Sequence, residues 1–527
     1  MKKKNILYYI SLLGLLMFSS CSDFLDTMPD NRTEIDSKAK ITSLLVSAYP
    51  TSLPVMAYEL SSDNTVDNGS QYDPFWKEIK SMYLWQDVKE VDDDNPSGIW
   101  DACYIAAAAA NQALKAIEEQ GNPTSLNPQK GEALLCRAYA HFVLANTFCM
   151  PYNPATASKD MGIPFSSEPE TKPVVEYERG TMEVLYKKIA ADIEDGLPLI
   201  EDDIYSVPRY HFNKKAAYAF ATRFYLFYTQ ADKSNYKRAI ECANEVLGTG
   251  SPTRVLRDWA GINALSTDLE LRGNAYISAS EQSNLLLNPI YSVWGYAHGP
   301  YEARNKRYGN SSTLFSKEGP QANGPWGSYS NLRVTNNNVF GLIQKRYIPK
   351  MLAYFEYTDK AAGIGFLHLV VPAFTTDETL LCRAEAYILS EQYGKAVTDV
   401  NDWLKTHVVN YTAKTQADLV EFYDKISYMP TSVTSDSQRT IKKKLNPQGF
   451  TVSEGVQENL IQCILHLRRI ETVHEGLRWL DVKRYGIEIA HNRSGESDDV
   501  LLKDDPRRAI QLPQDVIAAG LEANPRK

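Results

Sequence analysis

The sequence lacks the patterns that mark the commonest enzymes and nucleic-acid-binding proteins. It carries 56 Lys and Arg residues against 65 Asp and Glu, a formal net charge of −9. Such a chain has no basic excess with which to neutralise phosphate groups, which argues against a nucleic-acid partner. The metalloprotease pattern HExxH and the nucleophile pattern GxSxG are both missing. We therefore expect a binding protein rather than an enzyme, with no catalytic residue, no cofactor and no metal site.

Cysteine is scarce, with seven residues in 527. Six of them lie inside apolar helical patterns and lack the Cys-x-x-Cys spacing of metal and redox sites: Cys103, Cys136, Cys149, Cys242, Cys382 and Cys463. We expect these six to be small buried residues rather than disulfide partners or metal ligands.

The seventh cysteine, Cys21, follows an apolar run. Residues 6–18 are almost wholly apolar, but this run is shorter than the roughly 20 residues that span a bilayer. Three lysines precede the run and two serines follow it, which predicts a signal peptide over residues 1–20. Residues 18–21 (FSSC) resemble a bacterial lipobox, which implies that Cys21 is lipidated and anchors the chain to a membrane. The alternative is a cleaved signal in which this cysteine is incidental.

The dominant periodicity is that of the α-helix, so we expect a mainly α fold. The predicted helices cover residues 100–119, 128–148, 181–200, 214–229, 235–247, 376–390 and 393–407, with one or two more within 456–491.

Small and aromatic residues recur at fixed places in two of the helix pairs. Ala384, Tyr387 and Ala396 follow the tetratricopeptide pattern, and an earlier pair repeats it with a longer turn. We expect divergent tetratricopeptide-like hairpins within about 100–250 and 376–407, forming a scaffold with irregular, loop-rich insertions at about 248–375 and 408–455. Alternatively, alanine marks only the close contacts of any helical hairpin.

Short motifs occur in a fixed order along the chain. They are residues 21–26 (CSDFLD), 61–64 (SSDN), 131–139 (GEALLCRAY), 162–165 (GIPF), 468–484 (RRIETVHEGLRWLDVKR) and 510–513 (IQLP). This series resembles the SusD/RagB family of Bacteroidetes outer-membrane nutrient-uptake lipoproteins. The resemblance implies one SusD-like α-helical domain over residues 21–527, located at the outer membrane and exposed at the cell surface. It also implies a partner, a TonB-dependent SusC-like β-barrel transporter, and no covalent chemistry.

Charged residues interrupt two of the apolar helical patterns. Because charged groups stay buried only when they are paired, these residues predict ion-pair networks between helices. They are Arg137 in one helix and Arg468, Arg469, Glu471, Glu475 and Arg478 near the end of the chain.

Aromatic residues are concentrated in two stretches that do not have a helical pattern. Residues 289–329 contain eight aromatics in 41 positions, nearly twice the chain-wide 11%, and residues 72–85 contain five more. Aromatic rings pack on the apolar faces of sugars while amides and carboxylates bind their hydroxyls. The candidate ligand-binding residues are Trp294, Trp326 and Tyr296, followed by Trp76 and Trp85, with Asp63, Asn64, Asp67, Asn68, Asn323 and Asn331 as nearby polar groups.

Two kinds of ligand remain open at this point. The loop aromatics favour an oligosaccharide or polysaccharide, whereas tetratricopeptide surfaces commonly bind extended peptides. A peptide-binding lid, or a scaffold without a direct ligand, is therefore the alternative function. For any single ring, the competing interpretation is that it fills the small apolar core that a long loop needs.

Overall fold

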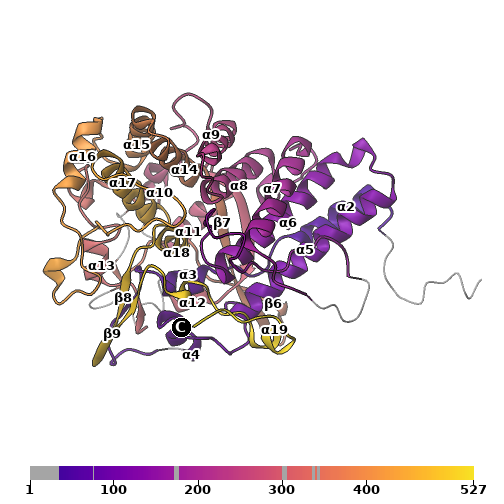
Figure 1. The fold of residues 1–527 in the computed structure, drawn as a ribbon, viewed down its shortest axis with the longest axis horizontal. Helices are drawn as coiled ribbons and strands as arrows, with labels where there is room; N and C mark the ends of the chain where they lie inside the picture. Colours follow the sequence, from indigo (N-terminus) through magenta and orange to yellow (C-terminus); the bar gives the residue numbers. More distant parts are fainter. Residues whose placement is uncertain are drawn as a thin grey trace, which may run out of the picture.

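The structure is a computed structural model that describes residues 35–526, except residues 75, 171–176, 267, 299–305, 335–338 and 341–344. Helices follow one another from α2 (Lys38–Leu45) at one end of the molecule to α16 (Gln416–Asp424) at the other (Figure 1). Strands and short helices lie on one side of this row.

The long helices pack against their neighbours in the chain, which confirms the predicted mainly α fold. Asn213 and Thr375 cap two of them, each accepting a hydrogen bond from a backbone N–H of the first turn. α5 packs on α6 and α6 on α7, α8 packs on α9, and α14 packs on α9, α15 and α17. Their bounds are α5 Pro96–Glu119, α6 Asn127–Phe148, α7 Met182–Gly196, α8 Lys214–Phe227, α9 Ser234–Leu247, α14 Thr376–Leu389, α15 Tyr393–His407 and α17 Val456–Glu471.

The residues of the tetratricopeptide pattern lie in the core. Ala384 and Ala396 are buried on the packed helices α14 and α15, and Tyr387 is buried beside them. A methyl side chain lets two helix backbones approach closely, while the ring fills the space next to the contact. The second set, Ala221, Phe224 and Ala239, is also buried. These positions confirm the hairpins that the sequence pattern predicts.

The insertion expected to be irregular at 248–375 contains a sheet, so that expectation is wrong for its strands. β2 (Asn284–Tyr291), β7 (Ile364–Thr375) and β6 (Tyr354–Asp359) form an antiparallel sheet in the order β2-β7-β6. β2 reads NLLLNPIY and is buried along most of its length, so it shows no alternation of apolar and polar residues. The insertion also holds α10 Trp259–Ala264, α11 Leu269–Tyr276, α12 Trp294–Ala297, α13 Ser312–Lys317, β3 Tyr308–Gly309, β4 Val339–Phe340 and β5 Lys345–Arg346.

The remaining elements lie near the two ends of the described chain. The helical pattern predicted over 456–491 gives α17 and a second, shorter helix, and then ends in a two-stranded sheet. These elements are α3 Val55–Ser61, β1 Val66–Asp67, α4 Lys77–Tyr83, α18 Arg478–Arg484, β8 Ile489–Arg493, β9 Glu496–Leu501 and α19 Gln514–Ala518.

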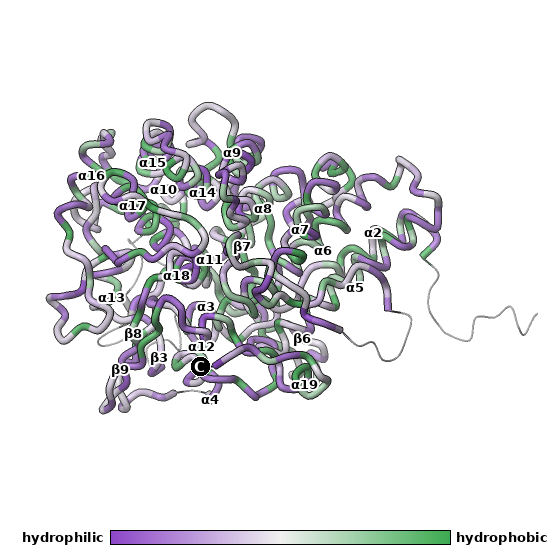
Figure 2. Tube along the Cα trace, in the orientation of Figure 1, coloured by the Kyte–Doolittle hydropathy of each residue, from purple (hydrophilic) through white to green (hydrophobic). Residues whose placement is uncertain are grey.

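One cluster of buried apolar side chains extends from Ile41 to Leu521. Hydrophobic stretches, drawn green in Figure 2, are spread over the described trace rather than gathered in one segment. The six cysteines after residue 100 are all buried and free, as predicted. Among the described residues, no helix combines the length and the apolar composition needed to cross a membrane.

The motifs at residues 61–64 and 468–484, near opposite ends of the chain, meet in a buried ion-pair network. Arg478 donates two hydrogen bonds to Asp63, at 2.8 and 3.0 Å, and Arg469 donates from Nε to the Asn64 side-chain oxygen at 2.8 Å. Lys443 lies 2.7 Å from Glu318 and 3.8 Å from Asp63. Burial alone would raise the pKa of Asp63, but the positive charges of Arg469 and Arg478 hold it well below its usual value.

A second buried network centres on Glu385 of α14. Arg484 and Tyr485 donate to its Oε1 at 3.0 and 2.6 Å, and Arg468 donates to its Oε2 at 2.5 Å. Burial opposes ionisation of this carboxyl, yet the two guanidinium groups lower its pKa to about 2. Together with a 2.7 Å pair between Arg137 and Asp192, these contacts confirm the predicted networks between helices.

Candidate functional site

Two aromatic-rich segments that are far apart in the sequence lie side by side. β1 pairs with β3 in antiparallel register, Val66 opposite Gly309. Beyond this pair, the Asn68 N–H donates to the Arg307 carbonyl and the Arg307 N–H donates to the Asp73 carbonyl, both at 2.8 Å. We call residues 66–74, Trp76 and residues 306–310 the loop junction. It brings together parts of the two stretches in which the sequence predicts ligand-binding rings.

The loop junction is held by an ion pair. The Arg307 guanidinium donates two hydrogen bonds to the Asp67 carboxylate, at 2.8 and 2.7 Å. The backbone N–H groups of Gly69 and Ser494 also donate to Asp67. Burial alone would raise the pKa of Asp67, but Arg307 and these amides lower it. The Asp67 carboxylate is therefore ionised, and its oxygens already accept hydrogen bonds from the protein. The Arg307 side chain stays 20% exposed.

Two of the predicted ligand-binding rings are half-exposed. Trp76 occupies the N-cap position of α4 and is 36% exposed, with exposed polar residues Gln71 and Lys77 near it in the chain. Tyr296 on α12 is 42% exposed. α12 reaches the loop junction through His298, whose Nε2 lies 2.7 Å from the Tyr308 carbonyl.

The other three predicted rings are buried, which corrects their expected place on the surface. Trp294 donates from Nε1 to the His474 carbonyl at 2.9 Å and stacks on His298. Trp85 donates to the Ser61 carbonyl at 2.9 Å. Trp326 packs with its ring centroid 5.1 Å from that of His466. All three are 5–7% exposed, because they fill the apolar interior that the long loops require.

The predicted polar ligand-binding residues also include both buried and partly exposed side chains. Asp63 and Asn64 lie in the buried ion-pair network, whereas Asn68 is partly exposed at the loop junction. Sequence reasoning missed Arg307, since its partner Asp67 is 240 positions away and no local pattern links them. Cys21 lies outside the described residues, so its lipidation stays a prediction.

The amino-terminal part of the chain matches a known family. Residues 23–226 match the SusD-like family described as "Starch-binding associating with outer membrane". No curated relative matches the chain.

Solved structures share the fold over nearly the whole length. A SusD superfamily protein from Bacteroides thetaiotaomicron is 18% identical, with a TM-score of 0.60 over 94% of this chain and 100% of its own. One from Bacteroides fragilis is 16% identical, with a TM-score of 0.61 over 92% and 99%. A SusD-like carbohydrate binding protein from Bacteroides vulgatus is 12% identical, with a TM-score of 0.53 over 91% and 96%. Residues 23–226 are thus similar to the SusD-like family, and the chain as a whole has the fold of these solved structures.

The protein also has an open cavity of about 620 Å³ beside α5. Trp100, Tyr104 and Ile105 of α5 line one wall, and Tyr177 and Leu521 contribute from other segments. The Tyr104 hydroxyl donates to the Pro164 carbonyl at 2.7 Å, which fixes this wall. The cavity is mainly apolar with acidic groups at its edge, and none of its lining residues belongs to the loop junction.

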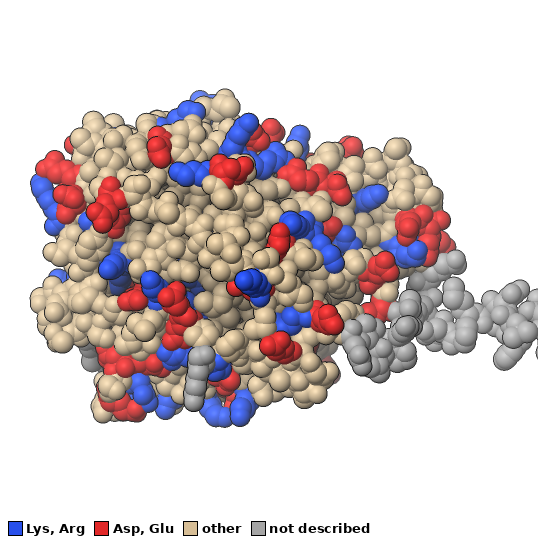
Figure 3. Space-filling view, in the orientation of Figure 1, with Lys and Arg blue, Asp and Glu red and all other residues tan. Residues whose placement is uncertain are grey.

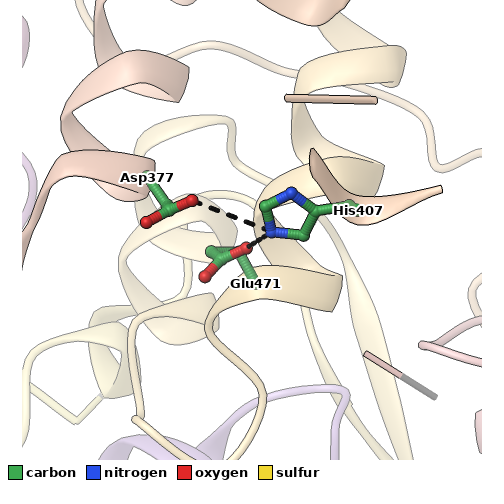
Figure 4. Close-up of side chains that lie close together, drawn as sticks. All are labelled: Asp377, His407 and Glu471. Atoms are coloured by element: carbon green, nitrogen blue, oxygen red, sulfur yellow. Dashed lines mark hydrogen bonds and ion pairs between the residues drawn. The ribbon is translucent and has the colours of Figure 1, made fainter. Parts of the chain in front are cut away.

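A buried trio of Asp377, His407 and Glu471 has donor atoms within 4.8 Å of one another (Figure 4). His407 Nε2 lies 2.8 Å from Glu471 Oε2 and 3.8 Å from Asp377 Oδ1. Trp259 Nε1 lies 3.1 Å from the same imidazole nitrogen, so groups of the protein already surround the atom that a metal would need. We interpret the trio as a buried hydrogen-bonded cluster that joins α14, α15 and α17.

Proposed function

We propose that this SusD-like protein is an outer-membrane lipoprotein, exposed at the cell surface, that binds a glycan and delivers it to a TonB-dependent SusC-like transporter. In this proposal residues 1–20 are removed, Cys21 carries the lipid and residues 21–527 form one domain. The observation that carries glycan binding is the loop junction, where Trp76 is half-exposed next to hydrogen-bonding side chains.

The chemistry of the loop junction suits a sugar. An indole face offers apolar contact to the C–H groups of a pyranose ring. Gln71 and Arg307 carry amide and guanidinium donors on the same segments, and the Asn68 amide donates to the Arg307 carbonyl, which leaves its oxygen as an acceptor. Because the pairing of β1 with β3 and the Asp67–Arg307 ion pair hold these segments together, the donors are fixed before a ligand arrives. Figure 3 shows acidic and basic side chains interspersed on one face, with no large patch of one sign there.

Replacing Trp76 with alanine is expected to weaken binding of the recognised polysaccharide at least tenfold, or about 1.4 kcal/mol, because the stacking surface is lost. A panel of polysaccharides and oligopeptides, screened by affinity gel electrophoresis and quantified by calorimetry, identifies the ligand first. Tyr357→Ala, which removes a more exposed ring on β6, is the control and should bind like the parent. Unchanged binding by both Trp76→Ala and Tyr296→Ala would exclude the loop junction as the site.

The alternative function is a peptide-binding lid or scaffold of the same kind of uptake complex. The cavity beside α5 favours it, since apolar walls with acidic edges suit an extended peptide with basic residues. In the same panel, peptide binding without glycan binding, lost on Tyr104→Ala, would support this alternative over the glycan function.

The anchor has a separate test. Cys21→Ala is expected to move the protein from the membrane fraction to the soluble fraction, because acyl chains provide most of the membrane affinity of an anchored protein. Cell fractionation followed by immunoblotting measures the change, with Cys103→Ala as the control. Retention of the Cys21 variant in the membrane would contradict lipidation at this residue.

A further inference from the structure

A second cavity of about 540 Å³ lies apart from the loop junction and has a different chemistry. It lies where α10 begins and α15 ends, next to the residues that precede β2. Its lining is mostly polar, and it shares no residue with the cavity beside α5. The charged groups in the lining are Arg254, Arg257, Asp258, Glu281, Arg333 and Lys405.

Three basic side chains of this pocket have no ion-pair partner among the described residues. Within the described chain, the side chains of Arg254, Arg333 and Lys405 make no ion pair or hydrogen bond that the structure records. Both acidic side chains are used by the backbone: Asp258 accepts from the Gly261 N–H at 2.8 Å and Glu281 accepts from the Ser283 N–H at 3.1 Å. Four basic groups and two acidic groups line the pocket in a chain whose net charge is −9, and Arg257 also interacts electrostatically with the Asp377 and Glu471 carboxylates.

Arg257 adds a buried donor to the pocket wall. It is 1% exposed and its guanidinium donates to the Tyr276 carbonyl and the Asn284 side-chain oxygen, both at 2.8 Å. The guanidinium also lies 3.8 Å from the centre of the Tyr276 ring. Its Nε has no acceptor among the described residues. A buried donor without an acceptor is uncommon in folded proteins and calls for an explanation such as a ligand or an ion.

We propose that this pocket binds the anionic group of a sugar, a carboxylate or a sulfate. Arginine side chains present paired N–H donors whose geometry matches that of these oxyanions. The volume falls within the roughly 300–1,000 Å³ of small-molecule sites. The sugar part of the proposal rests on the proposed function, whereas the anion part rests on the pocket alone.

The test is calorimetric titration of the purified protein with digalacturonate at low salt. We expect saturable binding that weakens at least tenfold in the double variant Arg333→Gln/Lys405→Gln and weakens with added NaCl, because partly exposed charges are screened. Lys360→Gln removes an exposed lysine on the β6–β7 turn and should bind like the parent. Lys405 is exposed and Arg333 is partly exposed, so thermal unfolding should be unchanged.

Two further ligands distinguish binding of the anionic group from binding of the sugar ring. Neutral digalactose should not bind this pocket, and inorganic sulfate should bind more weakly than digalacturonate. No binding of digalacturonate, or equal binding by the double variant, would overturn the site. Equal affinity for inorganic sulfate would overturn the sugar specificity. Binding of neutral glycans through Trp76 is independent of these variants, so failure here is distinct from failure of the proposed function.

Discussion

Asp63→Ala is expected to lower the free energy of unfolding by about 3–5 kcal/mol, the usual cost of removing one partner from a buried ion pair. Asp63 is the carboxylate to which Arg478 donates two hydrogen bonds, and Arg469 lies 3.4 Å from it. In the variant these two guanidinium groups remain buried, but the carboxylate that neutralised them is gone. Urea denaturation monitored by tryptophan fluorescence at pH 7 measures the change.

The control is Asp203→Ala, which removes an exposed aspartate and should change stability by less than about 0.5 kcal/mol. The loss of unfolding free energy in Asp63→Ala also depends on pH in a defined way. The pKa of Asp63 is lower in the folded chain than in the unfolded chain, where it is about 3.9. Asp63 therefore makes its full contribution to the free energy of unfolding above the unfolded-state pKa, and this contribution is lost as the pH falls through the folded-state pKa. A loss smaller than about 1 kcal/mol at pH 7 would show that this network contributes little to stability.

Trp294→Ala is expected to cost about 3–5 kcal/mol of folding stability, as large-to-small substitutions of buried aromatics do. The ring is 5% exposed, and its Nε1 donates to the His474 carbonyl, so the variant leaves both a cavity and an unpaired acceptor. A lowered melting temperature by calorimetry is the measurement. If this variant binds less ligand, the lost binding should match the fraction of the protein that is unfolded.

Trp76→Ala is the matched comparison, because it removes the same side chain from a half-exposed position. It should lower stability by no more than about 1 kcal/mol while weakening ligand binding. If Trp294→Ala stays as stable as the parent yet loses binding, then Trp294 contacts the ligand and the buried position described here is not the functional one.

The sequence by itself determined the helices and the need for buried ion pairs. Helical periodicity and capping residues such as Asn213 and Thr375 act within a few positions, so they can be read along the chain. Arg468 and Arg478 in apolar helices also had to find partners, because an unpaired buried charge is too costly. The identities of those partners, Glu385 and Asp63, could not be predicted from local patterns.

The tertiary structure decided which aromatic rings reach the surface and which segments meet. Trp294 and Tyr296 are two positions apart in one stretch, yet one is buried and the other is 42% exposed, because helix α12 turns them to opposite sides. The loop junction depends on Asp67 and Arg307, whose pairing spans 240 positions. Periodicity describes only neighbours along the chain, whereas burial and pairing depend on contacts between distant segments.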